Sequence, residues 1–521
     1  MAASTIDSAV SPKIHQQPLI IRTVARLIRA GAEIVDRIDR RLVGLQTYAA
    51  AVCAVALLQI ILIAYHSAWL DEAQGLLIAL HPGSVQQLLE QLRYEGHPSL
   101  WYFILRGLGT FVPYDLVLRA GSLLIAALIG WAILTSDRLS RAERLLLLCS
   151  EPVLIEYCSI SRSLGLGAAL IFVTLRLWRS PWVWLPLALL PQCDFLFGVI
   201  SILLIALRIS QNGFVRLPRM ATGIAAWIAS SMWAAYTVLP APDVVTDPVR
   251  PFAQQTLVFL SQLGTLAVPL QASLHGVEWN STYLLGIGFL PAAYFLFRNL
   301  AGRALQVRWM TYGLILFLLL FSTFVYSLYF RHITIVSMWL IAVYWVEGGS
   351  EPMNKATWRA WLLASAGCGL VTAAAILIHS FDTGERFAKR IEDAGLADAS
   401  LVSFPDWHSI AVSSALGRPI GGLERRCASS FMRWNHLQVR PISASGFDLL
   451  VEHMRSELGD FYLILPADAA VPVRGGQLIM SEPAGFDGMS YALWKIRSGE
   501  GSGRELPDCV VGLPMQPRGE R

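Results

Sequence analysis

Charged side chains are scarce in this chain. Only 15% of the 521 residues are Asp, Glu, Lys or Arg, whereas 55% are hydrophobic, and the mean hydropathy is +0.52. Because soluble domains carry about 25% charged residues, the composition excludes an ordinary water-soluble protein. The formal net charge is +4, which is too small for this length to indicate binding to nucleic acid, and we expect no nucleic-acid partner.

Several familiar signatures are missing as well. The sequence has no phosphate-binding P-loop, no metalloprotease helix and no serine-nucleophile elbow, so an ATP-driven pump is not expected. No internal repeat is evident, which argues against an inverted-repeat transporter. The seven cysteines show no zinc spacing. Two of them, Cys427 and Cys509, lie in the polar C-terminal region, where an oxidising compartment could pair them.

Long apolar runs are the main feature that the chain does have. Runs of about twenty apolar residues predict membrane-spanning helices. We place about eleven of them, near residues 47–66, 116–134, 144–158, 161–177, 181–193, 195–208, 221–239, 282–298, 309–329, 333–347 and 360–379. The fold class predicted from these runs is an α-helical polytopic membrane protein.

The first 46 residues are polar and basic, and no small-residue cleavage site precedes the first apolar run. We therefore expect residues 1–46 to remain attached as a cytoplasmic segment. The stretch from Leu19 to Leu42 places arginines among Leu, Ile and Val at helical spacing. This pattern fits an amphipathic helix on an anionic leaflet, with membrane lipids as partners, and it fits a solvated basic arm equally well.

Positive residues are distributed unevenly between the two sides that these spans define. If the N-terminus is cytoplasmic, most loop lysines and arginines fall inside, among them Arg138, Arg141 and Arg144. The outside loops hold only Arg93, Arg106, Arg119, Arg162, Arg250 and Arg331. The positive-inside rule therefore predicts a cytoplasmic N-terminus and, with an odd number of spans, an extracytoplasmic C-terminus.

The composition becomes that of a soluble protein from about Phe381. An amphipathic helix around Glu385 to Arg390 and β-like runs at Leu401–Phe404 and Phe461–Leu465 predict a small α/β domain with a flexible tail after about Gly499. The expected organisation is a basic N-terminal segment (1–46), a transmembrane module (47–380) with a first outer loop (67–115), and an extracytoplasmic domain (381–521).

The first outer loop carries acids at both ends. Asp71 and Glu72 follow the first span, and Glu95 directly precedes the segment that contains His97 and Tyr102. An acidic pair at the outer membrane surface is well placed to deprotonate an acceptor hydroxyl. The alternative, about equally supported by residue type, is a solvated helix N-terminus whose acids cap the helix and complement its dipole.

Other ionisable residues recur on the same side, namely Arg162, Asp194, Arg331 and His332. Such groups at an apolar boundary cost about 3 kcal/mol or more, so they usually have a partner or a function. Two arginines on one face suit a phosphate group, because guanidinium groups hold phosphate oxygens in pairs and stabilise the charge on a departing phosphate. Snorkelling to the interface also explains each arginine taken singly.

These segments resemble the C-type glycosyltransferases, the family that includes bacterial lipid A sugar transferases and protein mannosyltransferases. Members carry an acidic motif in the first extracytoplasmic loop, a segment like G-H-P-P-L-Y-Y, and an arginine that opens the fourth span. Here these become Asp71-Glu72, the segment from Gly96 to Tyr102, and Arg162. The resemblance covers residues 47–347, with specific motifs up to about Phe172; Ser99 replaces the second proline of the family's segment.

The resemblance implies a bacterial inner-membrane enzyme with a periplasmic C-terminal domain. It would move a hexosyl or pentosyl group, with inversion, from a polyprenyl-phosphate donor to a lipid, polysaccharide or protein acceptor of the envelope. Asp71 would be the catalytic base, and Glu72, Glu95 and Asp194 would be acidic neighbours that support it or hold a divalent cation. The donor would be bound by His97, Tyr102, Arg162, Arg331 and His332.

Two other classes of function remain open from the sequence. A lipid-linked sugar flippase or transporter would also have many spans, but it should place its charges near the bilayer midplane, whereas these cluster at one face. A non-catalytic subunit of an envelope polysaccharide assembly system would use the C-terminal domain for binding and would not need Asp71.

Overall fold

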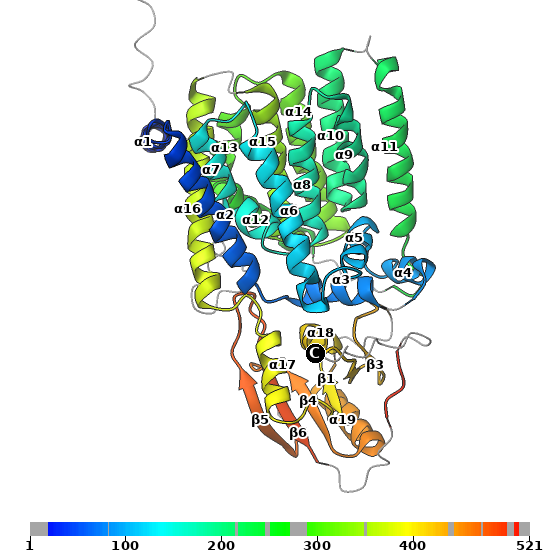
Figure 1. Cartoon of the computed structure of the whole chain (residues 1–521). Helices are drawn as coiled ribbons and strands as arrows, with labels where there is room; N and C mark the ends of the chain where they lie inside the picture. The colour runs from blue at the N-terminus through cyan, green and yellow to red at the C-terminus, as the bar shows by residue number, and fades with distance from the viewer. Residues whose placement is uncertain are drawn as a thin grey trace, which may run out of the picture.

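The computed structural model describes residues 19–81, 83–213, 217–244, 251–270, 289–348, 352–435, 442–469, 473–497 and 505–509. Figure 1 shows two parts, a tall bundle of helices and a smaller domain with a sheet packed against one end of the bundle. We call that end the domain end and the opposite end the far end. A polytopic helical protein with a small C-terminal α/β domain was predicted, and the structure confirms this fold class.

The bundle contains the helices of the predicted spans. They are α2 (Leu45–Tyr65), α6 (Val117–Leu134), α7 (Arg141–Leu148), η3 (Pro152–Tyr157), α8 (Ser163–Arg176), α9 (Trp184–Leu189), α10 (Phe195–Asn212), α11 (Leu217–Thr237), α13 (Phe289–Leu300), α14 (Leu305–Phe324), α15 (Phe330–Glu347) and α16 (Pro352–Ile378). Among the described residues, five helices are long and apolar enough to cross a membrane, and Ser163–Arg176 is a shorter apolar helix. Part of the predicted span 282–298 lies outside the described residues.

Two predicted spans are interrupted rather than continuous. The run 144–158 splits into α7 and η3, a π-helix that begins at Pro152, because proline has no N–H to continue the α-helical ladder. The run 181–193 splits in the same way at its prolines into η4 (Pro181–Val183), α9 and η5 (Leu190–Gln192). Hydropathy alone does not reveal such breaks, because proline interrupts hydrogen bonding without making the run polar.

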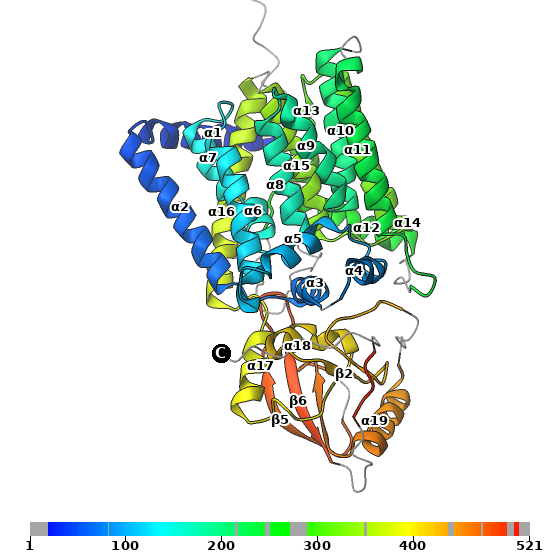
Figure 2. The same ribbon diagram turned by 45° about the vertical axis from the view of Figure 1, so that its right-hand side comes forward.

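The centre of the bundle is α15, whose residues from Ile333 to Trp345 are all buried. At the periphery, α2 is mostly apolar but largely exposed, with Leu57 58% and Ile60 53% accessible. Figure 2 shows α2 leaning away from the other helices. An apolar helix with exposed side chains is stable only next to lipid, so the exposure of α2 agrees with the prediction of a membrane protein.

The basic stretch at the N-terminus forms helix α1 (Leu19–Arg41), which lies across the far end of the bundle (Figure 2). Arg359 of α16 holds it there, because this guanidinium contacts both Asp36 of α1 and the buried Glu143 of α7. Leu27 of α1 is 67% exposed. The predicted helix is therefore present. Its binding to an anionic leaflet stays a prediction.

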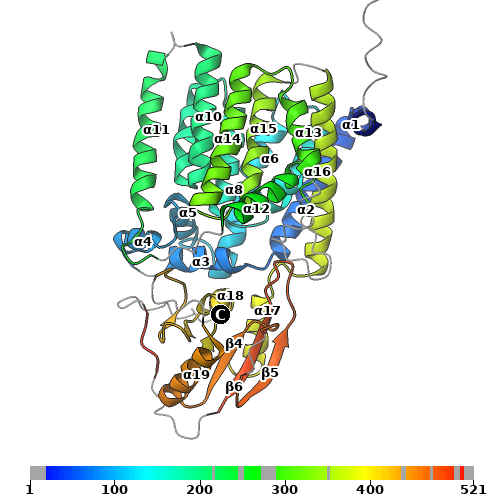
Figure 3. The same ribbon diagram turned by 180° about the vertical axis from the view of Figure 1, so that it is seen from behind.

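Three short helices lie between the bundle and the C-terminal domain (Figures 2 and 3). They are α3 (Leu70–Leu80), α4 (Val85–Leu92) and α5 (Leu100–Leu108), and all belong to the predicted first outer loop. Ser84 caps α4 by accepting a hydrogen bond from the backbone of Gln87. A further short helix, α12 (Phe252–Leu263) followed by η7 (Gly264–Leu266), lies beside the bundle at the same end (Figure 3).

The C-terminal domain is a six-stranded mixed sheet between helices. The strand order is β3-β2-β1-β4-β6-β5, formed by β1 (Leu401–Ser403), β2 (Ile420–Gly422), β3 (Ala428–Ser429), β4 (Phe461–Leu465), β5 (Gly476–Glu482) and β6 (Tyr491–Ile496), with β2, β1 and β4 parallel. Helices α17 (Gly384–Asp393) and α18 (Ile410–Leu416) pack on one face, and α19 (Ala444–Leu458) packs on the other. The predicted strands around 401–404 and 461–465 and the helix around Glu385 are present.

Residues 505–509 of the predicted flexible tail are attached to the domain, and the rest of that tail lies outside the described residues. Cys509 forms a disulfide with Cys427, and its backbone N–H donates to the carbonyl of Ala428 at 2.9 Å. The backbone of Ala428 donates in turn to Pro507. A Gly/Pro-rich composition indicates weak local structure, but a covalent cross-link between distant residues overrides it.

The disulfide can be tested by counting thiols in the full-length protein. We expect Cys427 and Cys509 to react with a thiol-specific mass tag only after reduction. Replacing Cys427 with Ser should destabilise the domain by about 2–5 kcal/mol, because the cross-link restricts the unfolded chain. Cys53→Ser is the matched control, since Cys53 is exposed and free; it should lose one tag under both conditions. Tagging of both residues without reductant would contradict the pairing.

Candidate functional site

Four helices begin close together at the domain end of the bundle. Trp69 is the N-cap of α3, Arg162 of α8, Asp194 of α10 and Tyr329 of α15. Each helix directs the backbone N–H groups of its first turn and the positive end of its dipole toward the region where it begins. The polar residues that the sequence placed on one side of the membrane are therefore gathered where an anion is stabilised.

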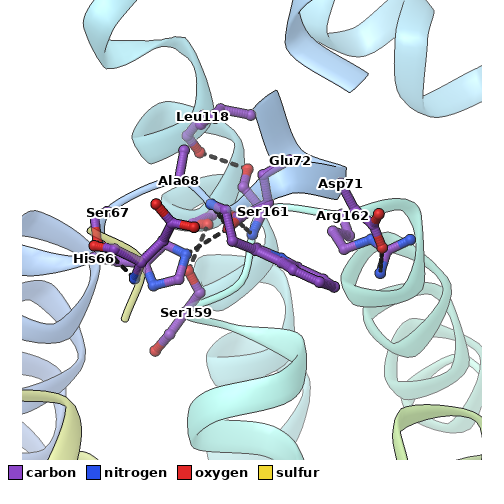
Figure 4. Close-up of polar contacts among 12 residues, drawn as sticks. His66, Ser67, Ala68, Asp71, Glu72, Leu118, Ser159, Ser161 and Arg162 are labelled. Carbon is purple, nitrogen blue, oxygen red and sulfur yellow. Dashed lines mark hydrogen bonds and ion pairs between the residues drawn. The ribbon is translucent and has the colours of Figure 1, made fainter. Parts of the chain in front are cut away.

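Asp71, in the first turn of α3, lies between two arginines. Its Oδ2 is 2.8 Å from Nη1 of Arg162 and 3.2 Å from Nη2 of Arg331. The Asp71–Arg162 contact is drawn in Figure 4. Both guanidinium groups also lie over the ring of Trp69, at 5.5 Å for Arg162 and 5.0 Å for Arg331. The predicted base and the two predicted phosphate-binding arginines thus form one cluster built from α3, α8 and α15.

The arginines determine the charge of Asp71. Burial raises the pKa of this carboxyl, but Arg162 and Arg331 outweigh that effect and lower it below its usual range. Asp71 is therefore ionised at neutral pH. Asp71 serves as the counter-ion of both arginines, while 24% of its side chain stays accessible. An anion that draws the arginines away would make Asp71 more basic.

Glu72 has a different environment from its neighbour. Its buried carboxylate accepts a hydrogen bond from the backbone of Ser161 at 2.5 Å and contacts Nε2 of His66 at 2.6 Å. Figure 4 shows Glu72 directed toward His66 and Ser161, away from the contact between Asp71 and Arg162. Glu72 therefore joins α3 to the turn that precedes α8, and this contact helps to position Arg162, the next residue after Ser161.

Glu95 is held near Asp71 by Gln74, a residue that the sequence did not indicate as part of the site. Nε2 of Gln74 donates to the Glu95 carboxylate at 2.7 Å and to the backbone carbonyl of Met432 at 2.9 Å, and Oε1 of Gln74 accepts from the Met432 backbone at 2.9 Å. Burial raises the pKa of Glu95 to about 8, with a further contribution from nearby Asp71. Glu95 is therefore mainly protonated at neutral pH, beside the ionised Asp71.

The predicted histidines have separate partners. Nδ1 of His97 is 3.1 Å from the carboxylate of Asp194, which also caps α10 by accepting from the backbone of Leu196. Nδ1 of His332 accepts a hydrogen bond from the backbone of Tyr329 at the start of α15. Tyr102 is buried in α5, and its pKa is raised by burial first and then by Glu95. Tyr102 is therefore close to the acids of the site.

A metal site does not emerge from the described parts of the chain. Within them, no group of three or more His, Cys, Asp or Glu side chains is arranged to hold a metal ion. Asp71 has arginines as its neighbours, and Asp194 has one histidine. The expectation of a divalent cation among Glu72, Glu95 and Asp194 therefore finds no assembled ligand set in these residues.

Sequence reasoning missed three contributors to this cluster: Trp69, Gln74 and Glu156. Trp69 provides the ring under both arginines, and Glu156 is a buried acid on η3 that interacts electrostatically with Arg331. A glutamine in an apolar stretch, as at Gln74, and an acid in a predicted span, as at Glu156, are signals that could have identified two of them.

No protein-family model matches the chain, and no curated protein matches its sequence. Among solved structures, the chain is similar to the crystal structure of ArnT from Cupriavidus metallidurans bound to undecaprenyl phosphate. The two proteins are 11% identical, with a TM-score of 0.42, and the similarity covers 86% of this chain and 97% of that one. A similarity at this level assigns no activity to the present chain.

The role of Glu72 as a structural contact can be tested by its removal. Glu72→Ala should lower the free energy of unfolding by about 1–3 kcal/mol, because the buried N–H of Ser161 loses its acceptor. The change should appear as a lower midpoint of thermal unfolding in detergent. Glu33→Ala, at an exposed position of α1, is the control and should change stability by no more than about 0.5 kcal/mol. Equal stability of the two variants would exclude this role.

Proposed function

We propose that this protein is an inverting glycosyltransferase that takes its sugar from a polyprenyl-phosphate donor. The observation that carries the proposal is the placement of Asp71 between Arg162 and Arg331. A carboxylate that can accept a proton lies next to two guanidinium groups that can hold a phosphate, and four helix N-termini favour negative charge at the same place. The motif resemblance to the C-type glycosyltransferases identifies the same residues.

In the proposed reaction, the acceptor hydroxyl attacks the anomeric carbon of the donor sugar while its proton passes to Asp71. The bond between that carbon and the phosphate oxygen breaks, and its electron pair leaves with the polyprenyl phosphate. Arg162 and Arg331 hold the charge of the departing phosphate. Attack from the side opposite the leaving group inverts the anomeric centre. No covalent enzyme intermediate is required, because the phosphate is already an activated leaving group.

The ion pairs of Asp71 with Arg162 and Arg331 determine the order of the steps, because the donor must bind before Asp71 becomes an effective base. In the free protein, the arginines lower the pKa of Asp71 and make it a weak base. When the donor phosphate binds, it competes with Asp71 for the guanidinium groups, so the carboxylate loses part of its stabilisation and its pKa rises. Donor binding thus activates the base, and proton uptake by Asp71 before donor binding is disfavoured.

We further propose that the site faces the periplasm from the inner membrane, with an envelope lipid, polysaccharide or protein as acceptor. Two independent features support this orientation. The positive-inside rule places the N-terminus in the cytoplasm, and the Cys427–Cys509 disulfide lies in the C-terminal domain at the opposite end from α1 (Figure 1). Disulfides persist in the periplasm and are rare in the cytosol.

The decisive variant is Asp71→Asn, assayed for transfer from a radiolabelled panel of polyprenyl-phosphate sugars in membranes. We expect a loss of about 10²–10⁴-fold in rate, because asparagine cannot take the acceptor proton. Asp115→Asn is the matched control, since Asp115 is exposed in the same loop, and it should transfer as wild type does. If wild type and Asp71→Asn both translocate the lipid-linked sugar and neither transfers it, the protein would instead be a flippase. Full transfer by Asp71→Asn would remove the proposed base.

Glu95 predicts an alkaline limit to activity. Because its pKa is raised to about 8, kcat/KM should fall as the pH rises through this value, when a second carboxylate appears beside Asp71 and competes with the phosphate for the arginines. The fall should be absent in Glu95→Gln, which stays neutral at every pH. Measuring the pH profile of both forms tests this, and an unchanged alkaline limb in Glu95→Gln would assign the limb to another group.

A further inference from the structure

A polar cavity of about 110 Å³ lies between the short helices and the C-terminal domain. Its walls come from the C-terminal end of α3, from α4, from α5 and from the segment 431–433 of the domain. The charged groups in these walls are Arg106, Arg433 and Glu90, which gives a formal charge of +1. His81 lies about 15 Å along the axis of α3 from Asp71, at 1.5 Å for each residue. The cavity is therefore separate from the Asp71 site.

His81 lines this cavity, and its imidazole makes no hydrogen bond within the described residues. Both ring nitrogens are buried, and neither has a partner among the described residues. The ring packs edge-to-face against Phe431, with 5.2 Å between the ring centroids. Burial and the nearby Arg433 keep the imidazole neutral by lowering its pKa. A neutral imidazole has one donor and one acceptor, and leaving both unpaired in the interior is costly, so the arrangement is suited to a polar ligand.

Two contacts fix the side chain of Arg433 at the wall of the cavity. Its Nε donates to Oε1 of Gln91 at 2.6 Å, and its guanidinium lies 5.2 Å from the centre of the Tyr94 ring. Within the described residues these contacts engage only one of its nitrogens. Arg106, on the other side of the cavity, donates to the backbone carbonyl of Gly83. Two fixed guanidinium groups and a neutral imidazole around a small volume are typical of an oxyanion site.

We propose that this cavity binds a phosphate or carboxylate group of the acceptor. The inference rests on the proposed function in assigning the ligand to the acceptor, whereas the recognition of an oxyanion rests on the cavity alone. Its separation from Asp71 matches an acceptor whose acidic group is one or a few sugar units away from the hydroxyl that reacts.

The cavity is also linked to the catalytic cluster. Phe431 and Arg433 in its wall flank Met432, whose backbone forms two hydrogen bonds with the side chain of Gln74. Gln74 in turn holds Glu95. An anion that fixes Arg433 would therefore stabilise the segment that positions Glu95, so acceptor binding in the cavity and the geometry around Asp71 are coupled.

The oxyanion site can be tested without a transfer assay. Full-length protein in detergent is treated with phenylglyoxal, which modifies accessible arginines, and each peptide is quantified by mass spectrometry across a series of inorganic phosphate concentrations at constant ionic strength. We expect phosphate to protect Arg433 and Arg106 in wild type and equally in Asp71→Asn. Arg93, the exposed C-cap of α4, should not be protected. Lack of protection at Arg433, or equal protection at Arg93, would overturn the site.

His81 variants separate binding from folding. His81→Ala should raise the phosphate concentration for half-protection of Arg433 by about tenfold or more, because a hydrogen bond to a charged ligand is lost. His81→Gln keeps a donor and an acceptor and should stay close to wild type. If both variants equal wild type in protection, His81 is not part of the site and the proposal fails.

The assignment of the cavity to the acceptor is tested separately, by the KM values in the transfer assay. In the transfer assay, His81→Ala should raise the KM for an acidic acceptor while the KM for the donor and kcat stay near wild type. A changed donor KM would assign the cavity to the donor instead. Protection of Arg433 in nanodiscs that contain phosphatidylglycerol, without added phosphate, would assign it to a bilayer headgroup. If wild type shows no transfer but phosphate still protects Arg433, the proposed function fails and the oxyanion site stands.

Discussion

The contact of Asp71 with Arg162 and Arg331 is the interaction on which the arrangement of this site depends. Three ionised groups lie at the boundary of an apolar bundle, where an uncompensated charge is costly. Asp71 offsets one of the two positive charges, which lets α3, α8 and α15 begin at one place, with Trp69 beneath both guanidinium groups. Under the proposed function, a donor phosphate would compete for the same guanidinium groups, so the contact that stabilises the cluster is also the one that the donor would replace.

The short helices of the first outer loop connect the C-terminal domain to this cluster through hydrogen bonds. One glutamine, Gln74, forms the hydrogen bonds of a peptide group with Met432 and also donates to Glu95. Glu72 ties the same helix to the backbone before Arg162. Helix α3 is thus fixed from the bundle on one side and from the domain on the other, which explains why an isolated helix of eleven residues is stable here.

The sequence was informative where a feature depends on composition and local pattern. The apolar runs identified the helices of the bundle, and the charge asymmetry placed Asp71, Arg162 and Arg331 on one side. The distinction between Asp71 and Glu72 could not be predicted, because it depends on which carboxylate meets Ser161 after folding. The contact of Gln74 with Met432 joins residues 358 positions apart, and no local signal indicates such a pairing. The breaks at Pro152 and Pro191 lay within reach of the sequence, since proline interrupts helices.

The connection between α16 and α17 determines how the domain behaves mechanically. It consists only of residues 379–383, and Phe381 within it is fully buried against His66 and Trp69. Ser67 bonds to the backbone N–H and carbonyl of Asp382. With so short a connection anchored at its middle, the domain cannot swing outward as a tethered arm or be exchanged between related chains as an independent cassette. A chimera between related chains keeps its fold only if the first outer loop and the C-terminal domain are exchanged together.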